Sequence, residues 1–98
     1  MTIVIFNPFA EQELVEAAAY YEELNKGLGL EYLNEVQNLI NFLIRYPEVG
    51  QVVQGSIRRI ILPKFPYSLM YRLIENGQIR ILAIAHHKRK PNYWQNRE

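Results

Sequence analysis

The sequence predicts an α+β domain in which a helical hairpin packs on one face of a mostly antiparallel sheet. Three observations carry this prediction. A short β-branched segment opens the chain, two amphipathic helical segments follow with almost no linker between them, and the second half consists of strand-like runs separated by turn residues. The expected order is strand, helix, helix and a three-stranded meander, within a single domain that covers residues 1–98.

The first strand and the first helix are expected on either side of an Asn-Pro pair. Residues 2–6 are rich in β-branched and aromatic side chains, which favours a strand. Asn7 can cap a helix, and Pro8 suits the first helical position, where a missing N–H costs nothing. Apolar residues then recur at helical spacing as far as Leu24, and Gly27 can end the helix in a left-handed conformation.

A second helix is expected over residues 28–46. Its apolar side chains recur at helical spacing, with Glu and Asn residues between them. Pro47 disfavours helical geometry at Tyr46 and therefore ends this helix. Because so few residues separate the two helices, they are expected to form an antiparallel hairpin.

The second half of the chain predicts a loop at residues 50–55 and then strands over residues 57–62, 67–74 and 78–85. Asn76-Gly77 lies between the last two strands and is typical of a two-residue type I′ hairpin turn.

The register of this hairpin predicts a binding surface. A two-residue loop pairs Tyr67 with His86 and Arg72 with Ile81, which leaves apolar side chains on both faces of the sheet. The two helices can cover only one face, and an exposed apolar surface of that size usually marks a binding site. The expected groove is lined by Ser68, Met70, Ile74, Ile79, Ile81, Ala83 and Ala85.

Composition excludes several kinds of site. The chain contains no cysteine, so it has no disulfide framework, no thiolate zinc site and no cysteine nucleophile. His86 and His87 are adjacent on a predicted strand, where they point to opposite faces, so we expect neither a metal nor another cofactor. No apolar run approaches the roughly 18–20 residues that span a bilayer, and no cleavable signal opens the chain. We therefore expect a cytoplasmic protein with no membrane partner.

The net charge of +1 conceals two halves of opposite charge. Residues 1–49 carry eight glutamates against Lys26 and Arg45, a net charge of −6. Residues 50–98 carry nine Lys and Arg residues against Glu75 and Glu98, a net charge of +7. Such asymmetry favours a polyanionic partner.

The basic C-terminal segment from His86 to Arg97 holds the main candidates for chemistry. Basic side chains contact phosphates, and aromatic side chains stack on unpaired bases. RNA cleavage without a metal needs a base for the 2′-hydroxyl, an acid for the leaving oxygen and cations for the transition state. The residues of suitable type are Arg58, Arg59, His87, Lys88, Arg89 and Tyr93. The alternative for this segment is a solvated basic terminus in which Trp94 only seals the core edge, and the alternative for Arg58 and Arg59 is pairing with helix glutamates.

Motifs along the whole chain resemble the RelE/ParE toxins of type II toxin–antitoxin systems, in particular the plasmid-stabilisation branch. Phe65-Pro66-Tyr67 is followed by Tyr71, and a strand then ends in a His-x-x-Arg-x-Pro motif. Further residues that carry the resemblance are Ala10, Leu14, Tyr20, Tyr21, Gly27, Leu28, Gly29, Pro47, Ile57, Arg58, Arg59, Ile81, Leu82, Ala83, His86, Arg89, Pro91, Trp94 and Arg97.

The resemblance implies a bacterial toxin that a cognate antitoxin silences by covering the predicted groove, and a homodimer is possible when the antitoxin is absent. RelE-like members cleave messenger RNA on the ribosome, whereas ParE-like members poison DNA gyrase without cleaving nucleic acid; a degenerate member that only binds a partner is a third alternative. The first expectation among these is a metal-independent, ribosome-dependent messenger-RNA endoribonuclease that uses His87, Arg89 and Tyr93 as catalytic residues; gyrase inhibition and simple partner binding are the alternatives. Ser68 and His87 stand where such ribonucleases usually carry arginines. The residues implied for binding nucleic acid or the target are Arg58, Arg59, Arg72, His86, Lys88, Lys90 and Arg97.

Overall fold

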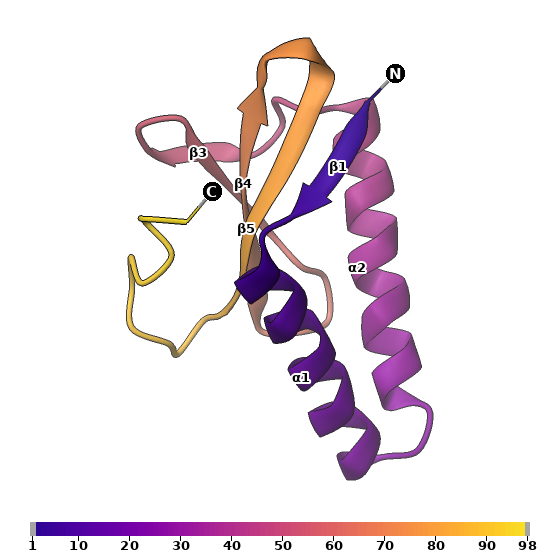
Figure 1. The fold of residues 1–98 in the computed structure, drawn as a ribbon. Coiled ribbons are helices and arrows are strands. Elements are labelled where there is room, and N and C mark those ends of the chain that lie inside the picture. Colours follow the sequence, from indigo (N-terminus) through magenta and orange to yellow (C-terminus); the bar gives the residue numbers. More distant parts are fainter. Residues whose placement is uncertain (1, 98) are drawn as a thin grey trace.

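A computed structural model describes residues 2–97 as two helices packed on a five-stranded sheet (Figure 1). The strands lie in the order β1-β5-β4-β3-β2, with β1 parallel to β5 and all other neighbours antiparallel. The predicted α+β class and the helical hairpin are therefore confirmed. The elements are β1 (Ile3–Phe6), α1 (Pro8–Leu24), α2 (Leu28–Arg45), β2 (Gln51–Gln54), β3 (Ile57–Ile61), β4 (Tyr67–Ile74) and β5 (Gln78–His86).

The helix ends follow from local chemistry. The Asn7 side chain caps α1 by accepting a hydrogen bond of 2.8 Å from the backbone N–H of Phe9, and Pro8 occupies the first turn. Gly27 separates the helices with φ +90°, a left-handed conformation that glycine adopts without a Cβ penalty. The Glu22 carboxylate accepts hydrogen bonds from the backbone N–H groups of Gly27 and Gly29, which holds the turn between the helices.

The close approach of α1 and α2 at Gly29 gives a first testable prediction. A Cβ added to Gly29 would lie 2.6 Å from the carbonyl oxygen of Ala18, which is backbone of the facing helix. Gly29→Ala should therefore lower the free energy of unfolding by about 1–3 kcal/mol in urea denaturation, because the helices must separate. Leu30→Ala, at an exposed position of the same helix, should change stability by less than about 0.5 kcal/mol. Equal stability of the wild type and Gly29→Ala would contradict the close packing.

The sheet separates two apolar clusters of side chains. On the face that packs against α1 and α2, here called the helix face, side chains of β4 and β5 such as Leu69, Tyr71 and Ile81 form the main core. On the opposite face, here called the tail face, Trp94 of the C-terminal segment packs against Ile57, Met70, Leu82 and Ala83.

The register between β4 and β5 differs from the prediction in one half of the hairpin. Tyr67 faces His86 as predicted, but Arg72 faces Arg80 rather than Ile81. The connection has three residues, Glu75–Gly77, because Ile74 pairs with Gln78. A bulge in β5, opposite Met70 and Tyr71, accommodates one extra residue, Leu82. On the side of the bulge away from the connection, the pairs from Met70–Ala83 to Tyr67–His86 are those predicted. Asn76 and Gly77 do take the positive φ angles typical of their turn, +73° and +76°.

The expectation of one continuous uncovered groove is wrong. Because a shift of one residue reverses which face a side chain points to, the bulge places Ile79 and Ile81 in the main core under the helices, where they are 1% and 0% exposed. Met70 and Ala83 do lie on the opposite face, but the C-terminal segment buries them. Ser68 is buried as well, and the remaining predicted groove residues, Ile74 and Ala85, are half-buried.

The predicted loop at residues 50–55 is also wrong, because it contains strand β2. This strand pairs antiparallel with β3 at the edge of the sheet, and all four of its side chains are exposed. The pattern Gln-Val-Val-Gln shows no alternation of apolar and polar residues, since neither face of the strand is buried. Within residues 2–97, neither helix has the length and apolar character needed to cross a membrane.

Candidate functional site

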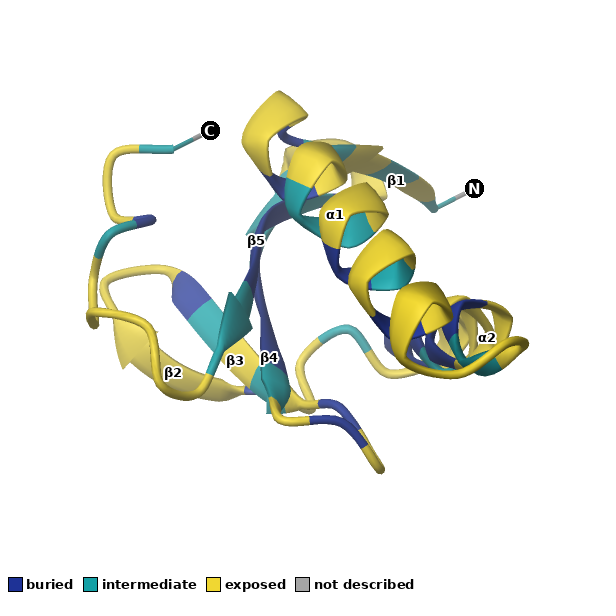
Figure 2. Ribbon diagram, turned by 90° about the horizontal axis from the view of Figure 1, so that it is seen from below, coloured by how far each residue is buried: buried dark blue, intermediate teal, exposed yellow. Residues whose placement is uncertain are grey.

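The C-terminal segment, residues 87–97, forms a layer of its own on the sheet. In Figures 1 and 2 it lies on the side of the sheet opposite the two helices. Trp94 is 6% exposed and fills the centre of the cluster on the tail face. The apolar surface on the tail face, which was expected to be uncovered, is therefore partly covered by the C-terminal segment of the protein itself.

A single glutamate of α1 holds this segment in place. The side chain of Glu13 is only 10% exposed. Oε1 accepts hydrogen bonds from the backbone N–H of Ile84 (3.1 Å) and from Arg97 (2.9 Å), and Oε2 accepts from Arg89 (3.0 Å) and from the Tyr93 hydroxyl (2.9 Å). We call this set of five residues the Glu13 clasp. It joins α1, β5 and the C-terminal segment through one carboxylate.

The clasp decides what Tyr93 and the arginines can do chemically. Burial and the hydrogen bond to Glu13 raise the pKa of Tyr93 well above its ordinary value of 10, so its hydroxyl stays protonated near neutral pH. Arg89 lies over the Tyr93 ring, 3.6 Å from its centroid, and Arg97 lies 4.9 Å from the same centroid. Both guanidinium groups share one carboxylate, which offsets part of their charge.

His87 takes no part in the clasp. Its Nε2 lies 3.0 Å from the hydroxyl oxygen of buried Ser68. The three predicted catalytic residues, His87, Arg89 and Tyr93, do line one cleft of about 380 Å³ between the C-terminal segment and the tail face. The structure thus brings them to one cleft, but Arg89 and Tyr93 bond to Glu13 whereas His87 bonds to Ser68.

The remaining predicted cations are spread over the surface. Arg58 donates to the carbonyl oxygens of Glu48 (2.7 Å) and Gly50 (2.8 Å), so it holds the segment that follows α2. Arg59 lines the same cleft as His87, and its Nη2 donates a hydrogen bond of 3.4 Å to Oε1 of Gln51. Lys88 and Lys90 are exposed, and Arg72 lies half-buried on the tail face.

His86 has local partners on the other side of the sheet. Its ring meets the Tyr67 ring edge-on at a centroid distance of 5.0 Å, and its Nδ1 accepts a hydrogen bond of 3.0 Å from the backbone N–H of Lys88. This bond spans two residues, so His86 stabilises the turn into the C-terminal segment. Among residues 2–97, no group of three or more His, Cys, Asp or Glu side chains is arranged to hold a metal ion.

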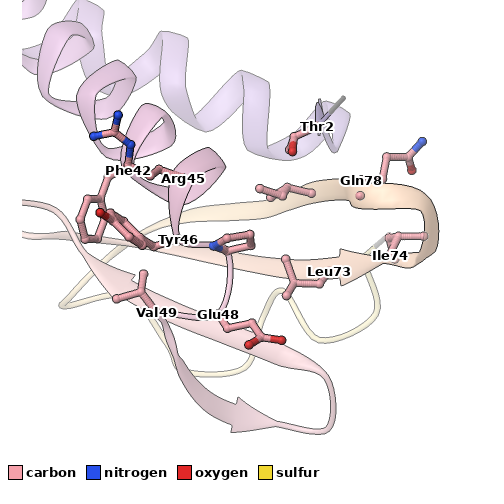
Figure 3. A pocket seen from close by; sticks show the side chains of 12 residues that line it. Thr2, Phe42, Arg45, Tyr46, Glu48, Val49, Leu73, Ile74 and Gln78 are labelled. Atoms are coloured by element: carbon pink, nitrogen blue, oxygen red, sulfur yellow. The ribbon is translucent and has the colours of Figure 1, made fainter.

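An apolar groove that sequence reasoning missed lies at the end of α2 (Figure 3). It has a volume of about 920 Å³ and lies between the last turn of α2, the segment after it and the β4–β5 hairpin. Exposed Phe42, Tyr46 and Val49 meet Leu73 and Ile74 there. In the sequence, the pair Phe42 and Tyr46 could have indicated this groove, because their spacing of four residues puts both rings on one side of the helix end.

Comparisons with known proteins agree with this architecture. Two solved structures resemble the chain in fold. One is described as "Chromosomal ParDE TA system from P. aeruginosa"; it has a TM-score of 0.64 and 21% sequence identity, and the match covers 88% of this chain and 96% of that one. The other is the isolated E. coli RelE toxin, with a TM-score of 0.57 and 16% sequence identity, and the match covers 97% of this chain and 94% of that one. No curated protein matches the sequence significantly.

Membership of a family rests on the sequence. Residues 4–91 match the family described as "ParE toxin of type II toxin-antitoxin system, parDE". The match extends from β1 through both helices and the remaining strands into the C-terminal segment. Because it covers most of the chain, and the fold agrees with solved toxins, this protein belongs to the ParE toxin family of type II toxin–antitoxin systems.

Proposed function

We propose that this toxin acts by binding DNA gyrase, as the resemblance to ParE-like members implies, and that it cleaves no bond itself. The observation that carries the proposal is the Glu13 clasp, which engages Arg89 and Tyr93, two of the three residues predicted to cleave RNA. The second, ribonuclease alternative remains as an outcome of the experiment described below.

The chemistry of RNA cleavage explains why the clasp matters. A base must take the proton of the 2′-hydroxyl, and cations must stabilise the charged transition state. Tyr93 is unsuited as a base, because its pKa is raised and its proton is bound to Glu13. Arg89 and Arg97 donate to the same carboxylate, which offsets part of their charge, and the Arg97 side chain is only 13% exposed, whereas that of Arg89 is 50% exposed. His87 is the remaining acid or base of the predicted set, and its Nε2 bonds to Ser68.

One observation favours the ribonuclease alternative. His87 is exposed and lines the same cleft as Arg59 and Lys90, so it stands beside cations that carry no ion pair within residues 2–97. Such a cleft could take a phosphate backbone. The lone histidine would then have to serve as base while a second group protonates the leaving oxygen.

The antitoxin that the family implies needs a surface different from the groove predicted on the sheet. The groove at the end of α2 is apolar, open and lined by exposed aromatic side chains, which suits insertion of apolar side chains from a partner. Only two members of the predicted groove, Ile74 and Ile79, line it. We assign the antitoxin to this groove, and self-association through the same surface stays the expectation for the toxin alone.

The test compares the two targets directly. The purified toxin should inhibit gyrase supercoiling at least tenfold and trap gyrase on DNA, while messenger RNA in a ribosome reaction stays intact. The co-encoded antitoxin should reverse the inhibition, which serves as the control for specificity. If ribosome-bound message is cut, and His87→Ala abolishes the cutting, the toxin is a ribonuclease and the gyrase proposal is wrong.

A further inference from the structure

Two arginines face each other on the tail face near the β4–β5 connection. Arg72 of β4 and Arg80 of β5 are direct partners in the antiparallel register. Cross-strand partners point to the same face, with Cβ atoms about 5 Å apart, and like charges in such a pair repel. The pair therefore weakens the hairpin unless an opposite charge compensates it.

Within residues 2–97, no ion pair supplies that opposite charge. Neither arginine forms a salt bridge with any described residue. None of the five strands contains an Asp or a Glu, so no strand residue can place a carboxylate beside the pair. Arg80 donates through Nε to the side-chain oxygen of Gln78, at 3.2 Å, and this oxygen is neutral.

Arg72 adds a second and independent sign of a missing partner. Its Nε is buried, yet no acceptor among the described residues 2–97 bonds to it. Buried polar atoms are bonded in the great majority of cases, and an unsatisfied donor needs an explanation. An anion above the two guanidinium groups would supply the missing charge and accept hydrogen bonds from their terminal nitrogens.

The neighbouring side chains indicate which anion fits. Ile5 of β1 is the register partner of Arg80, and Ile3 lies beside Gln78. Because Val4 and Phe6 pack into the main core, Ile3 and Ile5 project from the tail face, where they are 52% and 39% exposed. β1 is also an edge strand. Exposed isoleucines beside a pair of arginines suit a peptide with acidic and apolar side chains better than they suit a phosphate backbone.

We propose that Arg72 and Arg80 form a carboxylate-binding site for an acidic segment of the antitoxin, whose apolar side chains contact Ile3 and Ile5. A carboxylate can take two parallel hydrogen bonds from a guanidinium group, which gives the site geometric as well as electrostatic selectivity. The inference rests on the antitoxin partner of the proposed function and is independent of which target the toxin attacks.

The main experiment is isothermal titration of the co-encoded antitoxin into toxin variants. The double variant Arg72→Gln/Arg80→Gln should bind at least 30-fold more weakly than the wild type and show a smaller dependence on salt. Lys26→Gln/Lys64→Gln changes the net charge equally at exposed positions outside the site, and its affinity should fall less than threefold. Equal losses in both double variants, or no loss in either, would overturn the site.

Two further measurements keep the proposal testable if binding or folding complicates the titration. Removal of the like-charged pair should leave the melting temperature of Arg72→Gln/Arg80→Gln no lower than that of the wild type. In the wild type, the NMR signals of the Arg72 and Arg80 Nε–H groups should shift when the antitoxin is added. If a single-stranded RNA shifts them and the antitoxin does not, the site binds nucleic acid and the proposal is wrong.

The outcomes also separate this site from the proposed target. If the toxin leaves gyrase unaffected while Arg72→Gln/Arg80→Gln loses antitoxin affinity, the carboxylate site stands and the gyrase proposal is wrong. If the toxin inhibits gyrase while the variant binds the antitoxin as tightly as the wild type does, the gyrase proposal stands and the carboxylate site is wrong.

Discussion

Replacing Glu13 with alanine should lower the free energy of unfolding by about 3–5 kcal/mol, the usual cost of removing one partner from a buried ion pair. The variant leaves Arg97, whose side chain is 13% exposed, and the Tyr93 hydroxyl without their acceptor. It also removes the acceptor for the backbone N–H of Ile84. Urea denaturation at neutral pH measures the loss of stability. Because the C-terminal segment loses its anchor, limited proteolysis should also cleave the chain within residues 87–97.

Two control variants test whether the effect belongs to the carboxylate. Glu16→Ala on the same helix removes an exposed side chain that accepts a hydrogen bond from Gln12, so stability should change by less than about 0.5 kcal/mol. Glu13→Gln keeps the shape and should fall between the wild type and Glu13→Ala, since a neutral amide accepts weaker hydrogen bonds from arginine. If Glu13→Ala is as stable as Glu16→Ala, the clasp has no structural role.

Alkaline pH should destabilise the protein by about 3 kcal/mol between pH 10 and pH 12, because several buried tyrosines must ionise on unfolding. Burial raises the pKa of Tyr67 to about 12 and that of Tyr32 still further, and it also raises the pKa of Tyr93. A raised pKa in the folded state means that the native protein holds its phenolic protons more tightly than the unfolded chain. The contribution of these protonated tyrosines to the stability of the folded protein is therefore complete below pH 10, and the contribution of Tyr67 is lost as the pH rises through about 12.

Tyr32 offers a matched control for this pH dependence. Its ring is fully buried among Tyr21, Phe65 and Tyr67, while its hydroxyl finds no hydrogen-bond partner in the part of the chain that the structure describes, residues 2–97. Tyr32→Phe removes an unsatisfied polar atom and should be at least as stable as the wild type at pH 7. Its stability should then fall less steeply between pH 10 and pH 12. Parallel curves for the two proteins would show that Tyr32 contributes nothing to the alkaline transition.

Local signals predicted the elements of this fold well. The Asn7-Pro8 cap, the glycine between the helices and the proline after the second helix act within a few residues, and the observed helices, Pro8–Leu24 and Leu28–Arg45, agree with them. The toxin family also followed from motifs spread along the whole chain. These features depend on backbone propensity and on residue identity, both of which are readable without a structure.

The site was harder to predict because its contacts are distant in sequence. Apolar residues at helical spacing predicted the first helix but no role for Glu13, whose carboxylate meets partners at positions 84 to 97. No spacing rule connects a residue of α1 to a C-terminal segment that folds over the far side of the sheet. The basic and aromatic residues there were predicted to act together, but the bonds of Arg89, Tyr93 and Arg97 to Glu13 change what they can do.

What the sequence alone determined is therefore the order and type of most elements, the family and the opposite charges of the two halves. The tertiary structure decided which side chains share a face. One bulge at Leu82 moves Ile79 and Ile81 under the helices and brings Arg80 opposite Arg72. The physical reason is the two-residue period of a strand, in which a slip of one residue exchanges the two faces and costs little in local backbone propensity.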